Sequence, residues 1–160
     1  MNDILVIDNF FSEHDRTMIL RYCCQSSYNY GEVDVQGLPP TGMVHNIKEN
    51  SEIYQLVKSK ILQSYRKVRK LNLYRMYINC FAPSENPYFH TDGDDGVTFL
   101  YYANDQWELN DGGETQVIVN DEIKGILPLP NRMVGFNANL LHRATTFRFK
   151  HRFTMAAKFK

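Results

Sequence analysis

Three residues of types that bind transition metals occur in the order His90, Asp92 and, fifty positions later, His142. Residues i and i+2 of a β-strand point to the same face, so an expected strand at 87–91 would present the His90 imidazole and the Asp92 carboxylate together. Two histidines and one carboxylate on one side of a metal ion can hold Fe(II) and leave coordination positions open. A histidine beside a turn aspartate is also common on surfaces, so the pair alone leaves both interpretations open.

A second group that could bind a ligand lies in residues 151–159, where side chains alternate in character. Arg152, Thr154 and Ala156 share one face of this expected strand, and the apolar series from Phe153 to Phe159 forms the other. A guanidinium fork and a hydroxyl two residues apart make a good carboxylate clamp. An edge strand with a solvated polar face is the alternative, but the small side chain beside the pair favours space for a ligand.

The acidic residues Asp92, Asp94 and Asp95 raise a calcium loop as another alternative. The EF-hand pattern requires ligands at fixed positions, yet Gly96 takes one of them and Ala103 stands where the bidentate glutamate belongs. We therefore reject calcium.

The composition predicts one neutral domain spanning residues 1–160. Acidic and basic residues balance at 18 each, so neither nucleic acid nor a membrane is expected as a partner. Three cysteines, two of them adjacent, give neither a disulfide framework nor a zinc spacing and suit a reducing compartment. The N-terminus has no secretory pattern and no apolar run reaches the length of a membrane span, so we expect a cytoplasmic protein.

Two helices are expected before a run of strands. After a short strand at 4–7, Ser12 is a good N-cap for a helix over about 13–26, and apolar spacing predicts another over about 49–69. The turn-rich stretch 26–46 is expected to be an irregular loop, and a loop of this length is usually functional or mobile. A solvated helix face, rather than a nucleic-acid patch, is the favoured interpretation of the basic run Lys58, Lys60, Arg66, Lys67, Arg69 and Lys70.

From residue 71 the apolar period becomes two, which predicts strands for the rest of the chain. We expect them at 71–80, 87–91, 97–103, 115–119, 121–127, 132–137, 140–147 and 151–159. Two helices followed by many short strands indicate an α+β, mainly β fold. Helical support over 12–70 should pack on one outer face of a sheet sandwich or jelly-roll barrel over 71–160.

These segments together resemble the HxD…H…RxT signature of 2-oxoglutarate/Fe(II)-dependent dioxygenases, here His90-Thr91-Asp92, His142 and Arg152-Phe153-Thr154. Further segments are similar to those of the prolyl 4-hydroxylase-like branch. They are Val6–Ser12, Thr98–Asn104, Gly112-Gly113-Glu114-Thr115 and Leu127–Phe136. The resemblance covers nearly the whole chain, and its motifs occur in order.

The resemblance implies a double-stranded β-helix of the jelly-roll, cupin-like kind with the metal at the open end of the barrel. His90, Asp92 and His142 would bind Fe(II), and 2-oxoglutarate and O2 would take the remaining positions. Arg152, assisted by Thr154, would bind the 5-carboxylate of 2-oxoglutarate.

Other cosubstrate contacts implied by the resemblance come from Tyr77, Leu100 and Thr115. Phe81 stands where the family has a tyrosine that hydrogen-bonds the cosubstrate, and Tyr77 on the same strand would take that role.

The implied reaction converts 2-oxoglutarate to succinate and CO2 while an unactivated C–H bond is hydroxylated, with ascorbate left open as an accessory reductant. A prolyl residue in a peptide or protein is the leading substrate, and a small molecule or free amino acid is the alternative. The neutral charge disfavours a nucleic-acid demethylase, and the complete set of metal and clamp residues disfavours a non-catalytic β-barrel that binds a ligand or protein. The 26–46 loop is a candidate substrate lid.

Overall fold

The computed structural model describes residues 4–160 as two antiparallel sheets with helices on one outer face. The first three residues, which the predicted domain includes, lie outside the described part. Across the larger sheet the strands follow the order β1 Leu5–Ile7, β8 Met133–Asn137, β5 Val97–Tyr102, β10 Arg152–Phe159, β4 Leu73–Phe81, β3 Met43–Asn46 and β2 Asn29–Tyr30. The smaller sheet contains β7 Glu122–Ile126, β6 Thr115–Val119 and β9 His142–Ala144.

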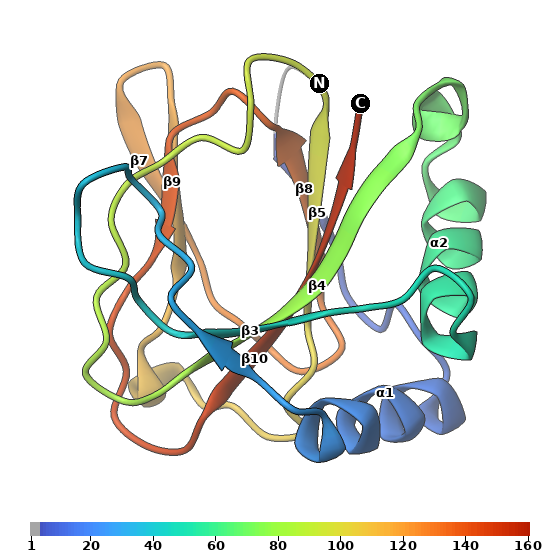
Figure 1. Ribbon diagram of the computed structural model, residues 1–160, viewed down its shortest axis with the longest axis horizontal. Helices are drawn as coiled ribbons and strands as arrows, with labels where there is room; N and C mark the ends of the chain where they lie inside the picture. The colour runs from blue at the N-terminus through green and yellow to red at the C-terminus, as the bar shows by residue number, and fades with distance from the viewer. Residues whose placement is uncertain (1–3) are drawn as a thin grey trace.

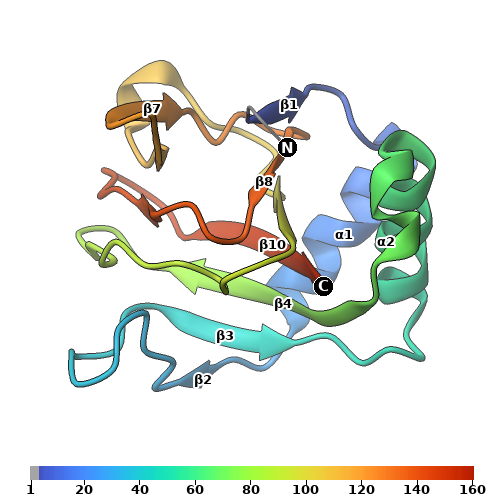
Figure 2. The same ribbon diagram turned by 90° about the horizontal axis from the view of Figure 1, so that it is seen from above.

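The smaller sheet lies on one side of the larger sheet and the helices lie on the other (Figure 1). Seen from above, β2, β3, β4 and β10 run side by side (Figure 2). This is the predicted jelly roll with outer helices, and the fold class is therefore confirmed. None of the helices in residues 4–160 has the length and apolar character needed to cross a membrane.

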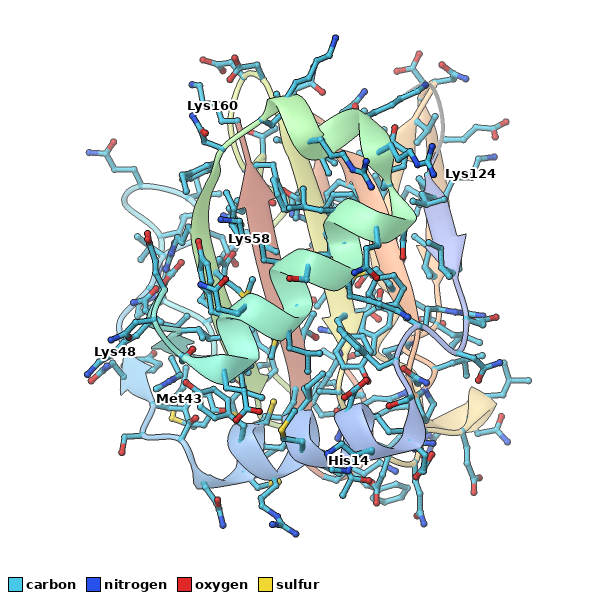
Figure 3. The ribbon with its side chains drawn as sticks, turned by 90° about the vertical axis from the view of Figure 1, so that its right-hand side faces the viewer. His14, Met43, Lys48, Lys58, Lys124 and Lys160 are labelled. Atoms are coloured by element: carbon cyan, nitrogen blue, oxygen red, sulfur yellow. The ribbon has the colours of Figure 1, made fainter. Side chains whose placement is uncertain are left out.

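Helices α1 Glu13–Gln25 and α2 Glu52–Ser64 cover the outer face of the larger sheet (Figure 3). The hydroxyls of Ser12 and Ser51 accept hydrogen bonds from backbone N–H groups three residues later, as N-caps do. Apolar side chains from both helices form one core with the strands beneath them, including Ile19, Val57, Ile61, Ile78, Met155 and Phe159.

The predicted helix 49–69 is too long at both ends. It begins after the Ser51 cap and ends at Ser64, and Arg66–Lys70 form a separate 3-10 turn. Tyr65 and Val68 are three residues apart, a spacing that suits either helix type, so the apolar pattern did not reveal the change.

The predicted irregular loop 26–46 was wrong at its ends, which form β2 and β3. Val44 of β3 pairs with Asn79 of β4, so the segment extends the larger sheet. Strand 87–91 was also wrong: there His90 forms only an isolated bridge with His142. Pro87 has no N–H to give to a strand ladder, and the Tyr88 N–H donates to the Asp34 side chain instead of to a neighbouring strand.

Strand β10 lies between β4 and β5, and its two faces have different surroundings. Met155, Ala157 and Phe159 belong to the core beneath the helices. Arg152 and Thr154 line a pocket between the sheets. The sequence alternation predicted this division.

Asn131 provides a test of how the loop before α1 is anchored. Its amide donates to Phe11 O and accepts from Phe11 N–H, each at 2.9 Å, within the buried interior. Asn131→Ala leaves two buried backbone groups unpaired and should reduce the free energy of unfolding by about 2–4 kcal/mol in urea titrations.

Asn120 is the matched control, because it is exposed and has a similar positive φ (51° against 60° for Asn131). Asn120→Ala reports only the backbone strain and should cost about 1 kcal/mol. Equal losses in the two variants would contradict the anchoring role.

Candidate active site

His90, Asp92 and His142 meet in the pocket between the sheets, with their ligand atoms within 4.8 Å of one another. Two backbone hydrogen bonds join the histidines, from His90 N to His142 O at 3.0 Å and back at 2.9 Å. Asp92 N donates to Ala138 O at 2.8 Å. Backbone bonds between distant segments therefore assemble the triad without the regular strand that we expected.

Both histidine rings are oriented by carbonyl groups of their own loops. Nδ1 of His90 lies 2.9 Å from Tyr88 O, and Nδ1 of His142 lies 2.9 Å from Leu140 O. A carbonyl only accepts, so each Nδ1 carries the hydrogen and Nε2 is the ring nitrogen directed toward the metal site. Nε2 lies 3.9 Å from Asp92 Oδ1 in His90 and 3.5 Å from Asp92 Oδ2 in His142.

The carboxylate of Asp92 is held by one donor on each oxygen. Thr98 Oγ1 donates to Oδ2 at 2.6 Å, and the Lys158 ammonium lies 2.7 Å from Oδ1. Burial raises the pKa of Asp92, but His142, Lys158 and the Thr98 hydrogen bond outweigh burial and lower it overall. Asp92 is therefore ionised at neutral pH.

Burial lowers the pKa of His142 below its ordinary value, against the opposing attraction of Asp92. The ring is thus neutral at neutral pH. A neutral imidazole and an ionised carboxylate are the states that bind a metal ion.

Arg152 lies at the inner end of the same pocket and is almost fully buried, with 2% of its surface exposed. Its Nη2 donates to Thr115 Oγ1 at 2.9 Å, and Tyr102 OH donates to the same oxygen at 2.8 Å. Within residues 4–160, Arg152 Nε and Thr154 Oγ1 have no hydrogen-bond partner, and no acidic side chain pairs with Arg152.

The Arg152 guanidinium, which has no acidic partner among the described residues, indicates an anionic ligand. A buried guanidinium without a counter-ion is costly, and two unused donors on neighbouring inward-facing side chains suit a carboxylate. Thr115 Oγ1 already accepts two hydrogen bonds, so its own hydrogen is available for the same ligand. The residues fit a metal ion at one end of the pocket and a ligand carboxylate at the other.

Every predicted site residue lines this one pocket, which has a volume of about 210 Å³. They are the three residues of the triad, Arg152, Thr154, Thr115, Leu100 and Tyr77. Leu100 forms an apolar part of the wall. Burial raises the pKa of Tyr77 to about 12, so its phenol stays protonated and able to donate.

The sequence interpretation missed several lining residues. Lys158 follows the same alternation as Arg152 and Thr154, and Arg75 follows that of Tyr77, so strand phase alone was sufficient to find both. Glu32 and Asp34 also line the pocket but come from the 26–46 segment, whose sequence gave no signal for individual residues.

A sequence model of the 2OG-Fe(II) oxygenase superfamily matches residues 74–159, more than half of the chain. The match runs from β4 to β10 and contains the triad and the clamp. A comparison with curated proteins gave no match.

Solved structures share the fold at low sequence identity. A Pseudomonas putida prolyl-4-hydroxylase superposes with a TM-score of 0.80 at 16% identity, covering 100% of this chain and 94% of that one. A Trichoplax adhaerens prolyl hydroxylase, in complex with a hypoxia inducible factor peptide fragment, gives 0.76 at 16%, covering 99% and 84%. HygX from Streptomyces hygroscopicus, with nickel and 2-oxoglutarate bound, gives 0.73 at 13%, covering 98% and 82%. These likenesses establish the fold.

The triad can be tested by metal binding without turnover. Replacing His90, Asp92 or His142 by alanine removes one of three protein ligands, and each change should weaken anaerobic Co(II) binding by about 100-fold or more in calorimetric titrations. His14→Ala is the control, because this exposed histidine lies on α1 (Figure 3) and is not among the residues that line the pocket. Wild-type affinity in the three alanine variants would disprove the assignment.

Proposed function

The chain belongs to the 2OG-Fe(II) oxygenase superfamily, and we propose that it hydroxylates an unactivated C–H bond of a prolyl residue in a peptide or protein. It is a 2-oxoglutarate-dependent dioxygenase that uses Fe(II), 2-oxoglutarate and O2. The observation that carries the site assignment is that Arg152 is buried without an acidic partner among residues 4–160, in the pocket that also holds the His-Asp-His triad.

We assign Fe(II) to His90, Asp92 and His142. The 5-carboxylate of 2-oxoglutarate is assigned to Arg152 Nε and Thr154 Oγ1, the two unpaired buried donors. Thr115 would add a third hydrogen bond, while Tyr77 and Leu100 bound the cosubstrate from the sides.

When bound, Fe(II) with 2-oxoglutarate and O2 supplies the oxidising power, and 2-oxoglutarate leaves as succinate and CO2. The residues of the chain provide position and protection from water. Thr98 and Lys158 hold Asp92 in one orientation, and Tyr88 O and Leu140 O do the same for the histidines. Ala156, between Thr154 and Lys158 along β10, is fully buried in the apolar cluster that includes Tyr77 and Leu100.

The prolyl substrate is supported by the fold neighbours described as prolyl hydroxylases, one of them solved with a peptide. A small molecule or free amino acid is the second candidate. It is favoured by the outer part of the pocket, where charged side chains of both signs line the wall, including Glu32, Asp34, Arg75, Arg143 and Lys158. We propose that the segment between β2 and β3 is the substrate lid, since it supplies Glu32, Asp34 and Thr41 to that wall.

Arg152→Met tests the cosubstrate clamp. Removing one partner of a desolvated charge pair typically costs about 2–5 kcal/mol, so affinity for 2-oxoglutarate should fall by about 30-fold or more in anaerobic titrations. Arg148→Met is the control at an exposed arginine outside the pocket, and its affinity should remain within about twofold of wild type. Equal affinities in both variants would contradict the clamp.

The assembled site should also have a spectroscopic signature. Anaerobic Fe(II) and 2-oxoglutarate added together to the wild-type protein should give a weak visible charge-transfer band, because the cosubstrate chelates the metal. Asp92→Ala should abolish the band and His14→Ala should retain it. A wild-type mixture without this band would count against the proposed function.

The hydroxylated substrate is then identified by a mass-spectrometric screen that compares peptides with metabolites.

A further inference from the structure

A second guanidinium, that of Arg75, lies in the outer part of the pocket and forms a bidentate ion pair with the carboxylate of Glu32. Arg75 Nη1 donates to Glu32 Oε1 at 2.8 Å, and Nη2 donates to Glu32 Oε2 at 2.6 Å. Both residues line the pocket that holds the triad. The arrangement is the bidentate geometry by which arginine binds any carboxylate.

Arg75 is built into the wall of the pocket. Its guanidinium carbon lies 4.1 Å from the centre of the Tyr77 ring, and Nε and Nη2 each lie 3.3 Å from Asn46 Oδ1. Arg75 is also paired across the sheet with Lys158, whose ammonium contacts Asp92 at 2.7 Å. A ligand held by Arg75 would therefore lie next to the metal ligands.

Glu32, in contrast, lies on a loosely attached segment. No residue from 29 to 41 is buried, and Gly31 and Gly37 adopt φ of +118° and +85° with open space around them. Polar contacts hold the segment down, such as the hydrogen bonds that Asp34 Oδ2 accepts from Thr41 Oγ1 and Tyr88 N. Segments with few buried apolar contacts open locally at low free-energy cost.

We propose that Arg75 binds a carboxylate of the substrate, and that Glu32 occupies this position until the substrate displaces it. The inference rests on the proposed function and specifies the substrate chemistry: a carboxylate lies close to the oxidised carbon. That carboxylate belongs to a free amino acid or to an acidic residue beside the target in a peptide. Displacing Glu32 couples substrate binding to release of the segment 31–42.

The test compares acids with their amides. Wild-type protein with Fe(II) and 2-oxoglutarate is given L-amino acids against their carboxamides, including L-proline against L-prolinamide. A second arm uses acetylated, amidated proline peptides with Glu or Gln beside the proline. Substrate-stimulated succinate release and the addition of one oxygen by mass are measured. We expect kcat/KM to favour the acid at least tenfold in the arm that contains the substrate.

Variants then assign that preference. Arg75→Gln should reduce the acid-to-amide ratio at least tenfold, whereas Glu32→Gln should lower KM for the acid because the internal competitor is weakened. Asp8→Asn is the matched control, because Asp8 forms a similar bidentate pair with Arg132 outside the pocket and the ratio should not change. An acid-to-amide ratio near one for a substrate that is turned over, or an unchanged ratio in Arg75→Gln, would overturn the proposal.

Hydrogen exchange separates this proposal from the proposed function, since it needs no turnover. Millimolar concentrations of the stimulating acid, or of L-proline where none stimulates, should accelerate exchange across 31–42 in the wild type, and its amide should not. In Arg75→Gln the segment should exchange rapidly without any addition. If the acid accelerates exchange across 31–42 but 2-oxoglutarate is not consumed, the proposed function alone is overturned. If 2-oxoglutarate is consumed but acid and amide affect exchange equally, this inference alone is overturned.

Discussion

The fixed antiparallel register of β10 between β4 and β5 is the constraint on which both the core and the site depend. A shift of one residue would move every side chain of a strand to the opposite face. Here such a shift would put Phe153 into the pocket and Arg152 beneath the helices, so packing and ligand binding would be lost together. The strand is paired on both sides from Thr154 to Phe159, which leaves no free edge along which it could slip.

The two guanidinium groups of the pocket differ in burial and in whether an acidic side chain pairs with them. Arg152 is desolvated and has no acid among the described residues, so its charge is compensated only by a ligand. Arg75 is about one third exposed (32%) and already forms an ion pair with Glu32. An unpaired buried charge selects strongly for an anion, whereas an occupied one exchanges partners at a smaller net change in free energy. The inner end thus suits an obligatory cosubstrate and the outer end a variable ligand.

Much of this arrangement was predictable from local sequence. The period of two sorted the faces of β10 and placed Arg152 and Thr154 on the face that lines the pocket, and the Ser12 cap located the start of α1. The errors arose where tertiary contacts override local pattern. The β3 strand depends on β4 to complete its hydrogen bonds, and His90 is positioned by backbone bonds to His142 rather than by a strand. Local periodicity along the chain does not encode such a long-range backbone pairing.

The ion pair between Lys158 and Asp92 has a further consequence for the protein without a bound metal. A buried carboxylate destined to bind a cation normally destabilises the empty fold, yet here an internal ammonium already neutralises it. The folded, metal-free protein therefore does not leave this buried carboxylate uncompensated, because the Lys158 ammonium lies against one of its oxygens.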